Sequence, residues 1–161
     1  MATPTNLPAS FVAGAVLTAA QQNDLRGAFR ILQVVQGTST TLATTTSATF
    51  ADTTITATIT PQSATSKVLV LVSQNAFSNT AGTGGTFRIV RGSTTIWAAA
   101  DICYGTASGN IDTWSPIYLD SPATTSATTY KTTFNRSSGA GTIFAQPNGS
   151  NSSIILCEVS E

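Results

Sequence analysis

Residues 47–61, SATFADTTITATITP, are the stretch that decides the fold. Within it, threonine alternates with Ile55, Ala57 and Ile59, which is the two-residue period of a strand with one buried face and one exposed face. Threonine suits the exposed face because its β-branched side chain is polar and favours extended backbone. The stretch therefore predicts a strand at the surface of an antiparallel sheet.

Further strand candidates follow at short intervals, separated by loops rich in Gly, Ser, Asn and Pro. They are residues 67–73, 86–90, 94–98, 102–104, 114–119, 127–134, 142–145 and 153–159. The glycines in AGTGGT (81–86) and RGST (91–94) are typical of hairpin connections, since glycine supplies the positive φ of tight turns. Together these segments predict an all-β chain, an antiparallel β-sandwich or jelly roll.

Composition agrees with a folded chain of one domain. The 161 residues include 30 Thr and 18 Ser, 41% are hydrophobic, and seven Lys plus Arg balance seven Asp plus Glu. A disordered chain would have fewer apolar residues and a larger net charge. Seven cationic groups with zero net charge do not favour electrostatic binding to nucleic acid or to an anionic membrane. We expect no nucleic-acid partner and no membrane insertion.

The first 36 residues differ from the rest. Residues 1–16 contain Pro4, Pro8 and Gly14 and predict an extended arm. Thr18 and Gln21 fit a capping box, and an apolar stripe at helical spacing follows it, so we expect one short α-helix. The expected anchoring residues of this segment are Leu17, Leu25, Phe29 and Leu32. We predict an N-terminal arm and anchoring helix over 1–36 and the sandwich over 37–161. The helix either docks onto a larger partner or packs on its own sandwich or trimer mates.

Two apolar runs interrupt the alternation, KVLVLVS at 67–73 and SSIILCEVS at 152–160. A strand of an antiparallel sandwich normally shows one face to water, so an uninterrupted run implies that both faces are covered. The outer face could be covered by a second layer of this chain or by a neighbouring subunit. We favour the subunit because most of the chain is already assigned to strands. The expected subunit interface comprises Val68, Val70, Val72, Ile155 and Cys157.

Catalytic chemistry has little support. The chain has no histidine, which is the commonest general base and metal ligand, and its carboxylates are scattered. We expect no enzyme activity, no catalytic residue, no metal and no cofactor. Cys103 and Cys157 fit buried thiols, with a disulfide left open. Core packing is favoured for most aromatic residues, whereas Tyr104 and Trp114 flank the loop 106–113 and are candidates for ligand contact.

Several segments resemble proteins of tailed bacteriophages. The head FVAGAVLTAAQQNDLRGAF (11–29) resembles a short N-terminal element of tail and other virion proteins. The body is similar to tail-fibre and virion modules through ITPQSATSKVLVLV, FRIVRGSTTI, YLDSPATTSATTYKTTF and IILCEVS. The order of these blocks also resembles the trimeric jelly-roll heads of the C1q and tumour-necrosis-factor kind.

The resemblance implies a non-enzymatic virion structural protein, assembled in the host cytoplasm, that forms a trimeric surface appendage. That appendage is a capsid decoration or a short tail fibre, since no collagen-like or coiled-coil shaft separates head and body. Its implied partners are other copies of itself and further capsid or tail proteins. The alternative is the head domain of a tail fibre, which attaches to the host through a receptor or a cell-surface glycan.

Overall fold

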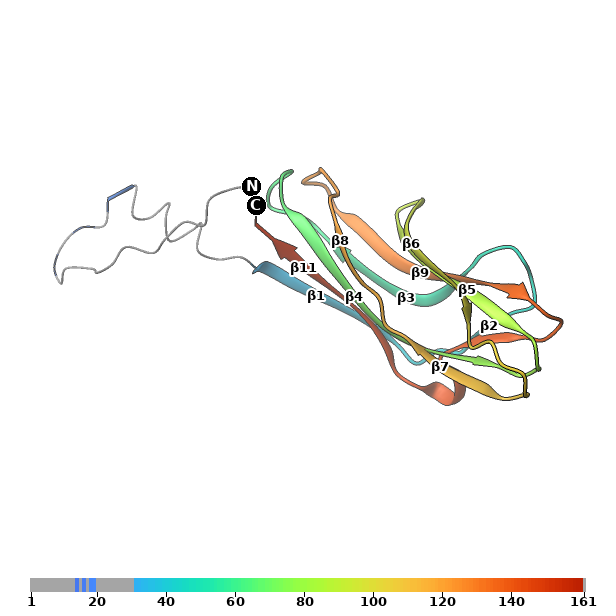
Figure 1. Cartoon of the computed structure of the whole chain (residues 1–161). Coiled ribbons are helices and arrows are strands. Elements are labelled where there is room, and N and C mark those ends of the chain that lie inside the picture. The colour runs from blue at the N-terminus through green and yellow to red at the C-terminus, as the bar shows by residue number, and fades with distance from the viewer. Residues whose placement is uncertain (1–13, 15, 17, 20–30, 161) are drawn as a thin grey trace.

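The protein is described by a computed structural model that covers Gly14, Val16, Thr18, Ala19 and residues 31–160. Two antiparallel sheets pack face to face in the body of the chain (Figure 1). The predicted β-sandwich is therefore confirmed. Most of the predicted arm and helix, including Leu17, Leu25 and Phe29, lies outside the described residues.

The larger sheet, called sheet one, has seven strands. They are β1 (Ile31–Ser39), β2 (Ala43–Thr45), β4 (Lys67–Ser78), β7 (Asn110–Trp114), β8 (Ile117–Asp120), β10 (Ile143–Ala145) and β11 (Ser152–Val159). The smaller sheet, sheet two, has four. They are β3 (Ala51–Ile59), β5 (Gly84–Arg91), β6 (Thr94–Ile102) and β9 (Thr128–Ser138). A 3₁₀ turn, η1 (Pro147–Gly149), connects β10 to β11.

Sheet one is built around the long strand β4. Its first half pairs with β11 on one edge and β8 on the other, and its second half pairs with β10 and β7. β1 and β2 flank β11 and β10. Strands that continue one another along the same line form what we call a lane. The seven strands occupy four lanes: β1 with β2, β11 with β10, β4 alone, and β8 with β7. Every lane except that of β4 is interrupted part-way along.

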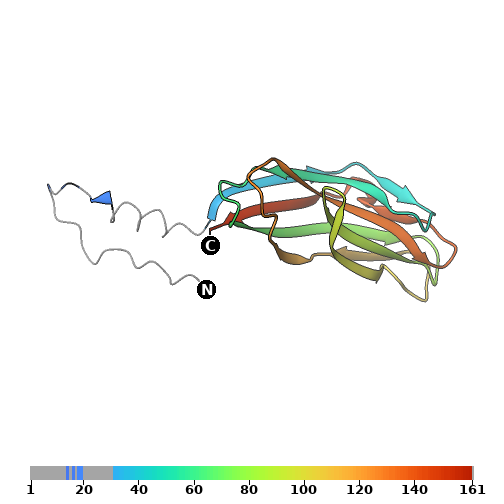
Figure 2. The same ribbon diagram turned by 90° about the horizontal axis from the view of Figure 1, so that it is seen from above.

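The order of the strands is that of a jelly roll. β1, β11, β4 and β8 lie side by side in sheet one, while β3, β9, β5 and β6 lie side by side in sheet two. Successive segments of the chain cross repeatedly between the two sheets, as Greek-key connections require. Because β1 and β11 are antiparallel neighbours, the start of β1 and the end of β11 meet at one end of the elongated sandwich (Figure 2).

The core forms as the threonine alternation predicts. In β3, Thr53, Ile55, Ala57 and Ile59 are buried and the residues between them are exposed. β4 alternates in the same way, with Val68, Val70 and Val72 inside. Leu156 and Ile154 of β11 face them from the neighbouring lane.

Two predicted strands have different limits. Residues 102–104 form no strand of their own, because β6 ends at Ile102 and Cys103 adopts a left-handed φ of 54°. The segment 114–119 is divided between β7 and β8, which are separated by Ser115 and Pro116. Proline has no amide hydrogen to donate to the ladder, so a strand breaks there.

The predicted helix does not extend to Leu32. Residues 31–39 form β1 and pair with β11, and Leu32 is the extra residue at a bulge between Ile31 and Gln33. Leu32 has helical spacing from Leu25 and Phe29, but its conformation follows from the pairing of β1 with β11, more than a hundred residues away. Tertiary contacts of this kind override local helix propensity. The predicted boundary between residues 36 and 37 consequently falls inside β1.

Gly37 allows β1 to approach β3 closely. A Cβ atom at this position would overlap the carbonyl oxygen of Thr56 and lie 3.3 Å from the Cβ of Ala57. We expect Gly37→Ala to lower the free energy of unfolding by about 2 kcal/mol, since one of the two strands must move. Urea unfolding measures the change. The exposed neighbour provides the control, because Thr38→Ala should stay within about 0.5 kcal/mol of the wild type; equal values for both variants would contradict the close approach.

Candidate subunit interface

The outer face of sheet one carries a continuous apolar patch. Strand register places Val34, Cys157, Leu69 and Leu119 in one row across four strands. The next row contains Ile155, Leu71 and Ile117. We call these seven residues the apolar patch.

Several of these side chains are open to solvent in the single chain. Val34 is 59% exposed, Ile117 is 68% exposed and Leu119 is 50% exposed, and Ile31 at the end of the patch is 55% exposed. The central residues Leu69, Leu71 and Ile155 are half-buried and Cys157 is buried, so the exposed side chains flank them on both sides. Isolated exposed apolar residues are ordinary, but an apolar surface that continues across a face typically marks an interaction surface. The patch is therefore the leading candidate for a functional site.

The outer face of sheet two is chemically different. The hydroxyl groups of Thr58 and Thr129 form a hydrogen bond of 2.8 Å, and Lys131 forms an exposed ion pair with Asp52 at 2.9 Å. Arg88 lies over the ring of Phe50, with its guanidinium carbon 3.2 Å from the ring centroid. Threonine and charged residues make this face suited to water, so the two outer faces of the sandwich differ in their surface chemistry.

A crevice opens beside the apolar patch where the lane of β7 and β8 is interrupted. Its volume is about 250 Å³, and its lining comprises Leu71, Val72, Ser73, Ser115, Ile117, Ser153 and Ile155. Four apolar residues and three serine residues contribute to the lining. The patch is thus hollowed and polar along one border, a combination found at protein interfaces.

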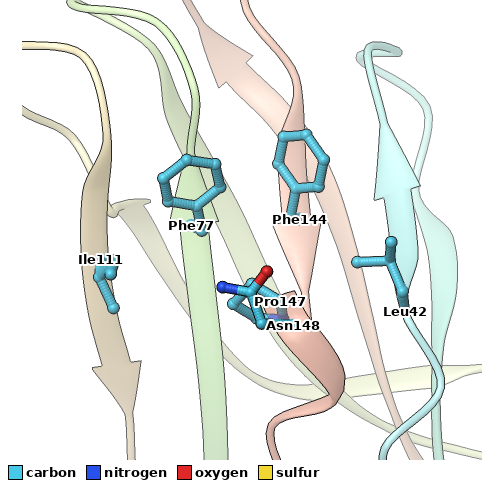
Figure 3. A pocket seen from close by; sticks show the side chains of 6 residues that line it. All are labelled: Leu42, Phe77, Ile111, Phe144, Pro147 and Asn148. Atoms are coloured by element: carbon cyan, nitrogen blue, oxygen red, sulfur yellow. The ribbon is translucent and has the colours of Figure 1, made fainter.

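A second apolar area lies further along the same outer face. Phe77 of β4 and Phe144 of β10 are paired neighbours whose ring centroids are 5.2 Å apart. They line a hollow of about 210 Å³ together with Leu42, Ile111, Pro147 and Asn148 (Figure 3). We call this the distal hollow. Ser73 and Asn75 of β4 lie between it and the apolar patch.

Three of the predicted interface residues are not on the outer face. Val68 and Val70 are fully buried in the core of the same chain and Val72 nearly so, because strand alternation persists within the apolar run. Ile155 and Cys157 do lie on the outer face, in register with Leu71 and Leu69. The prediction therefore named the inward residues of β4. The outward residues of the same run are Leu69 and Leu71.

The two residues predicted to contact a ligand are not brought together as a site. Trp114 is only 4% exposed and packs against Phe87 and Trp97, with ring centroids 5.6 Å and 5.5 Å away. It faces the core because it occupies an inward position of β7, so its predicted ligand role is wrong. Tyr104 follows β6 in a loop and is exposed.

The cysteines behave as small buried side chains. Cys103 and Cys157 are both free thiols and both buried, as the sequence predicts, and the disulfide that it left open does not form. Burial and the nearby carboxylate of Asp112 raise the pKa of Cys103 to about 12, against the opposing effect of a hydrogen bond from the backbone of Gly85. A thiol with so high a pKa is a poor nucleophile at neutral pH.

Glu158 ties three segments together beside the apolar patch. Its side chain is fully buried, accepting a hydrogen bond from Gln33 Nε2 at 2.6 Å and another from the backbone N–H of Gln62 at 2.7 Å. Burial by itself raises the pKa of this carboxyl group, but hydrogen bonds from Gln33, Ser66, Gln62 and Ser63 outweigh burial and hold the pKa below its usual value. The same Gln33 amide group also donates to the carbonyl oxygen of Thr60 at 2.7 Å.

We expect this carboxylate to make stability depend on pH. A group whose pKa is lower in the folded state stabilises the fold above its unfolded pKa, and this contribution is lost as the pH falls through the folded pKa. The free energy of unfolding should therefore fall as the pH drops below about 5, where the carboxyl group of Glu158 begins to take up a proton in the unfolded chain. Glu158→Gln should flatten that dependence, as judged by urea unfolding at several pH values. An equally steep dependence in the variant would contradict the role of Glu158.

Other kinds of site find little support in the part of the chain that the structure describes. Among those residues, no three His, Cys, Asp or Glu side chains gather where they could hold a metal ion. No helix within the same residues is long and apolar enough to cross a membrane.

Fold and surface together define the chain as a jelly-roll β-sandwich with one polar and one apolar outer face. No protein-family model matches the chain, and no curated protein matches it. Among solved structures, dimeric latent PorU from Porphyromonas gingivalis is similar over 81% of this chain, with 8% identity and a TM-score of 0.41. The similar region is 13% of the PorU chain, and a likeness of this size indicates no shared function.

Proposed function

We propose that this chain is a non-enzymatic structural protein of a tailed-bacteriophage virion, which forms a homotrimeric surface appendage. In this proposal the apolar patch of each copy faces its neighbours, and the N-terminal segment attaches the trimer to another capsid or tail protein. The appendage is a capsid decoration or a short tail fibre.

The apolar patch is the observation that supports this proposal most strongly. None of its residues is charged, so identical copies can bring their patches together without repulsion between like charges. The seven residues form two neighbouring rows of the outer face, in which Val34 on one side and Ile117 and Leu119 on the other are exposed. A second copy placed over these rows would remove their apolar surface from water, which is the main driving force of protein association.

A closed ring of three copies suits the chain better than an open array. The patch extends across all four lanes of sheet one, so each copy can contact two neighbours around an axis. Rings that close bury such surfaces completely, whereas open arrays leave them exposed at the ends. We propose three copies, rather than another number, because the sequence resembles trimeric jelly-roll heads.

Attachment through the N-terminal segment is directly testable. β1 begins at Ile31, at the end of the sandwich where β11 finishes (Figure 1). Deleting residues 1–30 should remove the protein from purified virions and leave the folded sandwich intact. Immunoblotting of particles and circular dichroism of the purified variant measure the two effects. Normal incorporation of the truncated protein would contradict the anchor.

The alternative function, a head domain that binds a host glycan, has one observation in its favour. The distal hollow presents the rings of Phe77 and Phe144 beside the exposed amide of Asn148 (Figure 3). Aromatic rings offer apolar faces to the C–H groups of sugars, and an amide can form hydrogen bonds with their hydroxyl groups. Binding of the purified protein to host surface glycans, lost in Phe144→Ala, would favour this alternative.

A further inference from the structure

Sheet one has a waist where the lanes on both sides of β4 are interrupted. On one side, Ser115 and Pro116 separate β7 from β8. On the other side, residues 146–151 separate β10 from β11. Strand register places both interruptions beside residues 72–75 of β4.

Buried polar groups gather at this waist. In the described part of the chain, seven buried side-chain nitrogen and oxygen atoms have no hydrogen-bond partner in the protein. Six of them belong to Gln74, Trp114, Gln146 and Ser150, and the remaining one belongs to Asn135. Gln74 and Gln146 are fully buried, with both polar atoms of each side chain among the six.

These groups are close neighbours in the fold. Gln74 and Trp114 are directly paired across β4 and β7, and both side chains are buried. On the opposite edge of β4, the backbone N–H of Gln146 donates to the carbonyl oxygen of Asn75 at 3.1 Å. Ser150 lies in the same connection between β10 and β11, where its backbone N–H donates to the carbonyl oxygen of Pro147. The four residues thus lie at the waist, on β4 and on both of its flanks.

We propose that the waist is a hydration site that binds about two ordered water molecules inside the sandwich. Leaving a buried polar group without a partner costs about 1–3 kcal/mol, so six such atoms need a ligand. The atoms are a mixture: Trp114 Nε1 and the two glutamine nitrogens donate, whereas the glutamine oxygens accept, and the hydroxyl of Ser150 can do either.

This mixture identifies the ligand as water. A cation would need acceptors and an anion would need donors, whereas water donates and accepts at once. A buried water molecule makes about three hydrogen bonds, so six atoms correspond to about two molecules. The site is independent of the virion role and of the apolar patch.

A high-resolution crystal structure of the full chain tests the proposal. We expect ordered water within hydrogen-bond distance of the Gln74 amide and of Trp114 Nε1 or the Gln146 amide. A waist without solvent, with the two glutamine amides bonded directly to each other or to the backbone, would overturn it.

Tryptophan fluorescence provides a second test in solution. The chain has two tryptophans, so Trp97→Phe leaves Trp114 as the only fluorophore. In that background Gln74→Leu should shift the emission to shorter wavelength, because Trp114 Nε1 loses its solvent partner. Gln36→Leu, at an exposed position of β1, is the matched control and should cause no shift. Unchanged emission in Gln74→Leu would count against the hydration site, and the wild-type crystal structure decides alone if that variant does not fold.

Discussion

Replacing Ile117 and Leu119 together with glutamate is expected to convert the assembled protein into folded monomers. Both side chains lie on the outer face of β8, and both are at least half exposed in the single chain, so their replacement removes little from the core. Burying each in an interface contributes about 2 kcal/mol, and a glutamate there would be desolvated without a partner. We expect the concentration needed for assembly to rise by about 1,000-fold, measured by sedimentation equilibrium.

A matched control separates the patch from a general effect of added charge. Ala98 is exposed on β6 and pairs with Arg88 of β5 within sheet two, so Ala98→Glu adds a carboxylate to the polar outer face of that sheet. This variant should assemble like the wild type. Dissociation by Ala98→Glu to the same extent, or assembly of the double variant at wild-type concentrations, would show that the outer face of sheet one is not the interface.

Replacing Asp120 with alanine is expected to cause a large loss of stability within one chain. Asp120 at the end of β8 in sheet one accepts a hydrogen bond from Tyr130 OH at 2.6 Å and pairs with Arg91 Nη1 at 2.7 Å. Tyr130 and Arg91 both belong to sheet two, so the carboxylate joins the two layers. Burial raises the pKa of Tyr130, and the hydrogen bond and charge of Asp120 raise it further, which keeps the phenol protonated as the donor.

Without Asp120, the buried phenol loses its acceptor and Arg91 loses its counter-charge. We expect Asp120→Ala to lower the free energy of unfolding by about 3 kcal/mol, measured by urea unfolding at one fixed protein concentration. Asp52→Ala is the control, since it removes an ion pair at the surface and should cost less than about 1 kcal/mol. Similar losses in the two variants would contradict the joining role of Asp120.

The sandwich was predictable because its main signal is local. Alternating threonine and isoleucine around Ile55 places one face of β3 inside without any knowledge of its partners. β1 was not predictable in the same way, because residues 31–36 also fit the end of a helical stripe. Their extended conformation depends on pairing with β11 at the other end of the chain.

The candidate site was only partly predictable for a related reason. The apolar run in β4 indicates that both faces of the strand are covered, and the outward leucines Leu69 and Leu71 support a covered outer face. Which alternate residues point outward depends on the register between the sheet and the core, which the run itself does not encode. The hydration site gave no sequence signal, because Gln74 and Gln146 look like ordinary surface residues until the strands on both sides of β4 are seen to break.

The solution mass of the wild-type protein tests the central claim most directly, because the claim is that copies of this chain cover the apolar patch of sheet one. Multi-angle light scattering at micromolar concentration should give a mass of about 50 kDa, three times the 16.5 kDa of one chain. A stable species of 16.5 kDa under the same conditions would contradict the claim.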